Sequence, residues 1–577
     1  MKNHIIILLL TGFLVFACNE KFLNLTPLSE GSSENWYQSD EEIIMAINYL
    51  YSNKFIRTNP ETYGTARRKY VDSWTDDWTN RASLTEVTNG TINGQVNYVV
   101  EWWKLFYECI AAANLVLEKI DNGVASNIAE NNLNKYKGAA RFARAYMYAR
   151  LITLWGDVPF FTKTLSIEEA FNLSRESKNI ILQSVYDDYD FAAANLPISY
   201  GTQEPQWATK GAALAMKARI ALYMEDWEIA RDAAKACIDL GIYDLYTDFS
   251  ALFFPETKNP KEAIFLSPRS LDPQQWDKGT LQEFCTRTPG GGAFHQPSWD
   301  LFCSFLCSDG MPIDESPLYN PQKPFQNRDP RCTATIVEFG TPHLFYIYQP
   351  HPDSLVTMNY TTGLYHTNND SRGVIQWASF NGIMRKKGVT EDWVDDWKTD
   401  PDDIIIRYAD VLLIFAEAKI ELGQIDQTVL NAVNMVRSRA YGVDYSQTSD
   451  YPAITTTDPL QLRKLLRVER RMEFAFEGLR YYDIIRWKLA EKVLNTSIYG
   501  MLDPAELRQK VIQPGLWFFP DAPPIDEDGI PDFQPMFNTG LIKKIVTRSF
   551  DKAKQYLWPI PSKEIIINDN LTQNPGY

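Results

Sequence analysis

Two segments of the chain have the pattern of a helical hairpin, and this pattern constrains the fold more than any other feature. In residues 212–240, alanines recur three positions apart on both sides of an Asp226-Trp227 turn: Ala218, Ala221, Ala230, Ala233 and Ala236. A second hairpin pattern spans 408–439. Small and large residues at fixed helix positions are typical of tetratricopeptide-like repeats. Because one such hairpin cannot bury its apolar face alone, we expect the hairpins to stack.

Helical periodicity also marks the segments 99–120, 135–155 and 178–196. It fails over 255–403 and 500–537, which are rich in Pro, Gly, Asn, Asp and aromatic residues. A long segment without periodicity inside a compact protein is usually functional or disordered, and the aromatic content argues against disorder. The sequence therefore predicts a mainly α fold of stacked tetratricopeptide-like helical hairpins, with a loop-rich irregular half that carries the ligand site.

The N-terminal residues have the pattern of an export signal. Lys2 precedes an apolar run from Ile5 to Phe16, and Ala17-Cys18 follows. The run is too short to span a bilayer, and a small residue before the cleavage point is typical of a signal peptide. The string LVFAC resembles a bacterial lipoprotein signal, which implies that Cys18 becomes the lipidated N-terminus. The alternative is ordinary secretion, with Cys18 present by chance.

The chain is accordingly divided into a lipoprotein signal peptide, a polar tether and two parts that we expect to form one compact body. The boundaries are 1–17 for the signal peptide, 18–39 for the tether, 40–254 for the N-terminal helical part and 255–577 for the C-terminal part, in which 404–490 is helical. No stretch after the signal reaches the roughly 20 apolar residues that a membrane-spanning helix needs.

Charge and metal-ligand patterns narrow the possible functions. Of the 577 residues 57 are basic and 73 acidic, so the net charge of −16 argues against a nucleic-acid footprint. Cys303 and Cys307 lack a second pair of zinc ligands, and we expect no cofactor and no metal centre. A structural calcium ion is a weaker hypothesis: Asp526, Asp528 and Asp532 are spaced like a short calcium loop, but a solvated acidic turn is the alternative.

Several strings along the chain resemble the SusD/RagB family, the surface lipoproteins of nutrient-uptake systems in Bacteroidetes. The strings are WKLFYECIAAANLVLEKI at 103–120, YKGAARFARAYMYARLITLWGDVPF at 136–160, NRDPR at 327–331, IIIRYADVLLIFAEAKIELG at 404–423, LRVERRMEFAFEGLRYYDIIRWK at 466–488 and YLWPIPSKEIIINDNLTQNPGY at 556–577. The resemblance implies a non-catalytic protein that is lipid-anchored in the outer membrane, faces the cell surface and covers a SusC-like TonB-dependent transporter as a lid.

The charged block within 466–488 is interpreted as structural. Glu469, Glu473 and Glu477 are four positions apart and alternate with arginines, including Arg470, Arg471 and Arg480. This spacing predicts ion pairs between helix positions three and four residues apart. Arg407 and Asp410 have the same three-residue spacing and are expected to pair.

Candidate ligand contacts are aromatic residues in loops with planar polar neighbours. A sugar ring offers an apolar face edged by hydroxyl groups, which suits Trp or Tyr together with Asp, Asn, Gln or Arg. The string VDSWTDDWTNR fits this description best. The main candidates are Trp74, Asp77, Trp78, Asn80, Arg81 and Trp276, and the weaker ones are Asp72, Trp102, Trp377 and Trp393. The alternative is a loop whose tryptophans close the edge of the core.

Three functions are compared. The first is a cell-surface protein that binds an oligosaccharide or polysaccharide and delivers it to the transporter. The second is a member of the same family that captures peptides or another nutrient, because the fold does not define the ligand. The third and weakest is a glycoside hydrolase using Asp76 and Asp77 as the carboxylate pair, although no isolated acid is placed opposite them. The Trp-rich loops favour glycan capture.

Overall fold

The computed structural model describes residues 36–52, 54–55, 71–123, 127–201, 206–271, 277–278 and 281–577. The signal peptide, Cys18 and Trp276 lie outside the described residues.

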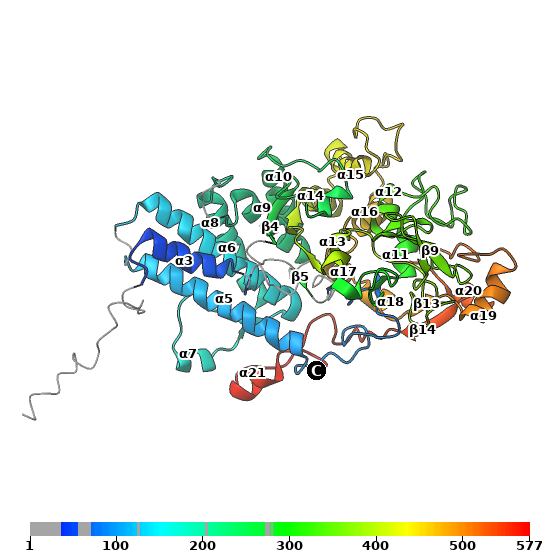
Figure 1. The fold of residues 1–577 in the computed structure, drawn as a ribbon. Coiled ribbons are helices and arrows are strands. Elements are labelled where there is room, and N and C mark those ends of the chain that lie inside the picture. Colours follow the sequence, from blue (N-terminus) through cyan, green and yellow to red (C-terminus); the bar gives the residue numbers. More distant parts are fainter. Residues whose placement is uncertain are drawn as a thin grey trace, which may run out of the picture.

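Helices make up most of the regular structure, which confirms the predicted mainly α fold (Figure 1). They are α3 (Asp40–Leu50), α5 (Asn97–Asp121), α6 (Glu130–Trp155), α7 (Ile167–Phe171), α8 (Lys178–Asn195), α9 (Lys210–Tyr223), α10 (Trp227–Ile238), α11 (Trp299–Ser304), α12 (Pro330–Thr335), α13 (Asp392–Asp395), α14 (Tyr408–Glu421), α15 (Gln427–Ala440), α16 (Pro459–Glu473), α17 (Arg480–Arg486), α18 (Ala490–Val493), α19 (Pro504–Leu507), α20 (Gln534–Asn538) and α21 (Ser562–Ile567).

The strands of the described residues are short and form antiparallel pairs, so no large sheet is built. The pairs are β1 (Trp78–Thr79) with β6 (Gln296–Pro297), β2 (Val158–Pro159) with β3 (Arg175–Glu176), β4 (Ala263–Ser267) with β12 (Asp403–Arg407), β5 (Asp277–Lys278) with β11 (Lys398–Thr399), β7 (Thr341–His343) with β8 (Tyr346–Tyr348), β9 (Val356–Met358) with β10 (Tyr365–Thr367), and β13 (Ser497–Gly500) with β14 (Lys543–Thr547).

The two predicted hairpins are present as α9–α10 and α14–α15, and α10 packs against α14. Local sequence explains where these helices begin and end. The Thr209 side chain accepts a hydrogen bond from the backbone N–H of Ala212, and that of Asp426 accepts one from Thr428. Ala218 and Ala221 on α9 and Ala230 on α10 are fully buried where the two helices approach each other, whereas Ala236 faces solvent. The hairpins therefore stack as their small-residue spacing predicts.

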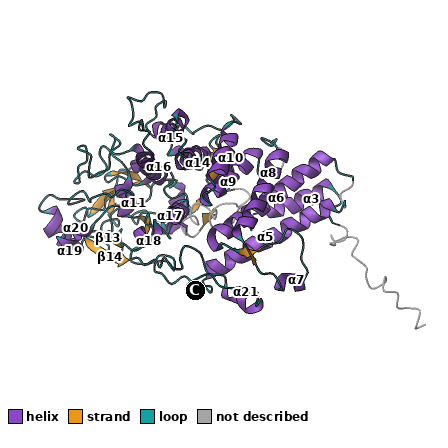
Figure 2. Ribbon diagram, turned by 180° about the vertical axis from the view of Figure 1, so that it is seen from behind, coloured by secondary structure: helices purple, strands orange, loops and turns teal. Residues whose placement is uncertain are grey.

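The N-terminal helical part and the helices of the C-terminal part share one apolar core, and Figure 2 shows α14 beside α9 and α10. Buried residues of α3, α5, α6, α8 and α9 pack in the same cluster as those of α14, α15 and α16, and Trp558 from the C-terminal segment completes it. A second core lies within the loop-rich half, around Trp299 and Phe519. The loops are thus anchored to a packed core, and a precise surface site requires such support.

The charged block on α16 is buried, and its ion pairs differ from the predicted ones. Glu473 accepts hydrogen bonds from Arg331 at 2.9 Å and Arg407 at 2.6 Å, and it also pairs with Arg439. None of these partners lies on α16. The structural interpretation is correct, but the predicted pairing along the helix is wrong because the side chains point into the core and meet other elements.

The predicted pair of Arg407 with Asp410 is also wrong. Arg407 instead pairs with Glu262 at 2.6 Å, and the Asp410 carboxylate accepts hydrogen bonds from Arg219 at 2.7 Å and Arg470 at 2.9 Å. Arg407 ends β12 and Asp410 lies in the first turn of α14, but their side chains point to different partners.

Candidate ligand-binding surface

Trp74 and Trp102 lie in an interior aromatic cluster. Trp74 is 0% exposed, and its ring centroid lies 5.4 Å from that of Trp102, 5.0 Å from that of Trp558 and 5.3 Å from that of Tyr481. Neither ring reaches solvent, so the prediction that they contact a ligand is wrong. Trp74 on the loop and Trp102 on α5 meet where α5, α17 and the C-terminal segment come together, and burying such large apolar rings there is strongly favourable.

Trp78 and Trp393 belong to the second core. Trp78 is 3% exposed and makes edge-to-face contacts with Phe284 at 5.5 Å and Phe476 at 5.3 Å. Trp393 is 0% exposed and contacts the same Phe284 ring. Both are packing residues, and the predicted stacking on a ligand is wrong for them as well.

The acidic residues of the same loop face arginines instead of a ligand. Arg471 donates to Asp76 at 2.8 Å and to Asp77 at 2.8 Å, and Arg480 donates to Asp76 at 2.9 Å. Burial alone would raise the pKa of Asp76, but these two guanidinium groups outweigh it and hold the pKa well below its usual range.

Asp72 and Asp77 are also buried, and the Oδ1 atom of Asp72 accepts the backbone N–H of Gly478 at 3.2 Å. The prediction of ligand contacts is wrong for both. Their carboxylates instead fasten the 72–81 segment to Arg471 on α16 and to Gly478 just after it.

Arg81 follows β1, and its side chain does reach the surface. Its backbone has φ = +52°, a left-handed conformation that is uncommon outside glycine and often marks functional positions. The Nη2 atom donates to the carbonyl oxygen of Gly292 at 2.5 Å and to that of Trp377 at 3.1 Å. Two residues predicted separately, Arg81 and Trp377, are therefore brought into direct contact.

Trp377 is the exposed aromatic residue of this arrangement, with 49% of its surface accessible. Its ring is stacked with that of Phe380, with centroids 6.4 Å apart and planes 19° apart. The Arg81 Cζ atom lies 5.6 Å from the centroid of Trp377 and 5.3 Å from that of Phe294. We call Arg81, Arg287, Phe294, Trp377 and Phe380 the Arg81–Trp377 platform.

The glycine run at 290–292 shapes one side of the platform. A Cβ atom on Gly291 would lie 2.3 Å from the carbonyl oxygen of Cys285, so only glycine fits this close approach. The tight turn presents the Gly292 carbonyl, which accepts from Arg81 and, at 2.9 Å, from the Nη1 atom of Arg287. The glycine run therefore forms a tight turn that positions two arginines.

Three members of the platform were missed by sequence reasoning: Arg287, Phe294 and Phe380. Only the glycine run beside Arg287 and Phe294 could have pointed to them. Asn80 was predicted and lies next to Arg81, but its Oδ1 atom accepts from the Trp78 indole at 2.8 Å and contacts His295. The Asn80 side chain is therefore bonded to two buried residues, Trp78 and His295.

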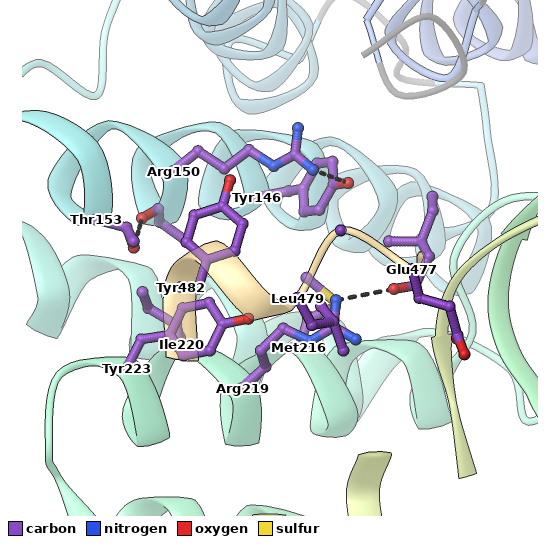
Figure 3. Close-up of a pocket in the computed structure, with 13 residues that line it drawn as sticks. Tyr146, Arg150, Thr153, Met216, Arg219, Ile220, Tyr223, Glu477, Leu479 and Tyr482 are labelled. Carbon is purple, nitrogen blue, oxygen red and sulfur yellow. Dashed lines mark hydrogen bonds between the residues drawn. The ribbon is translucent and has the colours of Figure 1, made fainter. Parts of the chain in front are cut away.

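Two other hollows are less suited to a sugar. A cavity of about 60 Å³ lies between α6, α9 and α17, lined by residues such as Tyr146, Arg150 and Tyr223 (Figure 3). This volume is far below the roughly 300–1,000 Å³ of ordinary ligand pockets. A groove of about 600 Å³ runs beside α16, but none of the described residues lining it, such as Leu465 and Val468, is aromatic.

The acidic turn proposed for calcium is neutralised by basic side chains. Lys492 Nζ lies 2.7 Å from Asp526 and 2.6 Å from Asp528, the position that a cation would need. Asp532 accepts the backbone N–H of Gln534 at 2.9 Å and does not complete a site. The calcium hypothesis is therefore wrong for this turn, and the described residues hold no group of three or more His, Cys, Asp or Glu able to bind a metal.

The described part of the chain contains no helix with the length and hydrophobicity that a membrane span requires.

Comparisons with known proteins give the family. Residues 261–577 match the model of the SusD family, and 21–222 match a model described as "Starch-binding associating with outer membrane". The SusD-like protein P2 of Formosa agariphila is 25% identical, covering 100% of this chain and 99% of that protein, and P25 of the same species is 24% identical over 85% and 92%.

Solved structures agree. A SusD-like carbohydrate-binding protein from Bacteroides fragilis has a TM-score of 0.75 at 27% identity, covering 93% of this chain and 99% of that one. A laminarin-binding SusD-like protein has a TM-score of 0.61 at 17% identity, over 94% and 100%, which shows the shared fold. Because its family model covers more than half of the chain, this protein belongs to the SusD/RagB family.

Proposed function

We propose that this protein binds an oligosaccharide or polysaccharide at the cell surface, on the Arg81–Trp377 platform, without cleaving it. The observation that carries the proposal is Trp377, a half-exposed indole held in place by Phe380 and by the Arg81 side chain. An immobilised ring offers its apolar surface to a sugar at little entropic cost. The Bacteroides fragilis relative is described as carbohydrate binding, which supports the same class of ligand.

Delivery to a SusC-like TonB-dependent transporter and anchoring through Cys18 complete the proposal. The support for the membrane location is the lipoprotein-type signal in the sequence and the outer-membrane wording of the matching N-terminal family model. Cys18 lies outside the described residues, so the anchor is inferred from its sequence alone.

Two alternatives are less well supported. A glycoside hydrolase needs two carboxylates flanking the scissile bond, but Asp76 and Asp77 are buried against Arg471 and Arg480 and cannot reach a substrate. Peptide capture usually exposes backbone donors and acceptors, whereas the Gly292 and Trp377 carbonyls of the platform are already bonded to arginines. Glycan capture therefore agrees best with the geometry.

Affinity electrophoresis tests the proposal directly. The purified protein is run through gels that contain single polysaccharides, both neutral and acidic, with bovine albumin as the non-binding reference. We expect retardation in at least one gel and no release of reducing sugar from that polysaccharide. Retardation in none of the gels, together with binding of a peptide digest, would favour the peptide alternative, and release of reducing sugar would favour the hydrolase.

A further inference from the structure

We propose that the sugar bound by the Arg81–Trp377 platform is anionic and carries a carboxylate or a sulfate group. This inference rests on the proposed function, because it names the ligand class of the same surface. It comes from the arrangement of Arg81 and Arg287.

Two guanidinium groups converge on the same two oxygen atoms. Arg81 and Arg287 donate to the Gly292 carbonyl at 2.5 Å and 2.9 Å, and to the Trp377 carbonyl at 3.1 Å and 3.5 Å. Burial and the neighbouring charge of Arg287 together lower the pKa of Arg81. Like charges held this close repel each other, so the arrangement costs free energy in the unliganded protein.

The nearby acids do not form ion pairs with these arginines, although the buried Asp370 carboxylate interacts electrostatically with Arg287. Asp370 uses its two oxygens to accept the backbone N–H groups of Arg287 at 2.6 Å and Thr288 at 3.3 Å. Glu283 pairs with His295 at 2.8 Å. Among the described residues, neither platform arginine forms an ion pair, and the Nε atoms of both are buried without a hydrogen-bond partner.

Elsewhere in the same molecule, several buried arginines are neutralised by carboxylates, although the buried Arg328 donates to the backbone carbonyl oxygens of Phe302 and Phe305. Arg331, Arg407 and Arg480 each contact at least one carboxylate within 2.9 Å. The chain has 16 more acidic than basic residues, so carboxylates are not scarce. Two neighbouring arginines that share no carboxylate partner are nevertheless uncommon in such a protein, and uncompensated charges of this kind cluster at functional sites.

The geometry suits an acidic sugar. Guanidinium groups bind carboxylates and sulfate-like oxyanions through paired N–H donors. The Cζ atom of Arg81 lies 5.6 Å from the centroid of the Trp377 ring, so the guanidinium group and the exposed indole are direct neighbours on one surface. A sugar packed on Trp377 can therefore direct its acidic group to Arg81 and Arg287, which relieves their repulsion.

The test compares acidic and neutral polysaccharides by isothermal titration calorimetry. The carboxylated probes are polygalacturonate and alginate, the sulfated probes are dextran sulfate and carrageenan, and the neutral probes are dextran, laminarin and xylan. The variants are Arg81→Gln, Arg287→Gln and Trp377→Ala. Arg231→Gln is the control, because Arg231 is a surface arginine of α10 that pairs with Asp232 at 2.7 Å.

We expect at least one acidic probe to bind more tightly than every neutral probe, and each platform variant to weaken that binding about tenfold or more while Arg231→Gln leaves it unchanged. The carboxylated and sulfated sets identify which anion is preferred. Because Arg81→Gln can also disturb the Trp377 loop, the wild-type protein is titrated at 50 and 500 mM NaCl, where acidic-probe binding should weaken at high salt.

The two proposals fail in different ways. If a neutral probe binds as tightly as every acidic one, with an affinity that depends on Trp377 but not on the two arginines or on salt, the anionic inference is overturned and the platform remains a glycan site. If no probe binds in a Trp377-dependent manner, both proposals are overturned.

Discussion

Replacing Glu473 by alanine should destabilise the whole fold without changing the ligand. The carboxylate is 0% exposed and sits among the guanidinium groups of Arg331, Arg407 and Arg439, which come from three different elements of the chain. Its removal leaves three buried cations facing one another. All three arginines keep another carboxylate partner, Glu469 for Arg331 and Glu262 for Arg407 and Arg439, but the net charge of the cluster rises by one.

The expected cost follows from the energetics of buried ion pairs. Removing one partner of such a pair costs about 3–5 kcal/mol, because the remaining charge is left desolvated. Folded domains are stable by only about 5–15 kcal/mol, so Glu473→Ala should lose a large fraction of the total. Glu473→Gln keeps the shape and some hydrogen bonds, so its cost should be smaller but still more than about 1 kcal/mol.

Urea denaturation followed by tryptophan fluorescence measures this cost, because many of the 16 tryptophans are buried. Glu506→Ala is the matched control. Glu506 forms a 3.1 Å pair with Lys510, and both side chains are about half exposed, so its loss should cost about 0.3–0.5 kcal/mol. A Glu473→Ala protein as stable as Glu506→Ala, or one that folds normally but no longer binds its glycan, would refute the structural role of the cluster.

Other expected outcomes concern the core, acid stability and anchoring. Trp78→Ala should lower the free energy of unfolding, measured by urea denaturation, by about 3–5 kcal/mol because it leaves a cavity in the core. Unchanged stability together with lost glycan binding would show that Trp78 contacts the ligand. Acidification from pH 6 to pH 3.5 should lower the urea midpoint. Burial raises the pKa values of Glu473 and Asp410, but the neighbouring arginines outweigh burial and hold both pKa values below their usual range. The unfolded chain then takes up protons first, below about pH 4.3, and stability is lost as the pH falls; a midpoint independent of pH over this interval would contradict the paired cluster. Cys18→Ala should leave the protein folded but move it from the membrane fraction to the soluble fraction, as judged by immunoblot, and unchanged membrane retention would contradict lipidation.

Much of the fold could be predicted because helix periodicity is a local property. The small residues of α9 and α10, the turn at Asp226 and the end of α6 at Gly156 all act within a few residues of each other. Local spacing therefore located these helices within a few residues of their observed ends. The partners of Glu473 could not be predicted in this way, because each of the three arginines is at least 34 positions away along the chain.

The ligand surface was harder to predict because exposure of a tryptophan is a tertiary property. Trp74, Trp78 and Trp377 all stand in loops beside polar residues, and nothing in their local sequence separates them. Burial separates them: the first two fill the space between packed elements, whereas Trp377 lies on a loop that ends at the surface. The contact between Arg81 and Trp377 spans 296 positions, so only the folded chain reveals it.

The binding affinity of Trp377→Ala tests the central claim most directly. The ligand is the polysaccharide that the wild-type protein retains best in affinity gels, and the control is Phe171→Ala, whose ring on α7 is 51% exposed, close to the 49% of Trp377. If glycan capture takes place on the Arg81–Trp377 platform, Trp377→Ala should weaken binding by about 30-fold or more, equivalent to about 2 kcal/mol, with no loss of stability. Phe171→Ala should bind like the wild type. A Trp377→Ala protein that binds within about twofold of the wild type would show that the glycan is held elsewhere.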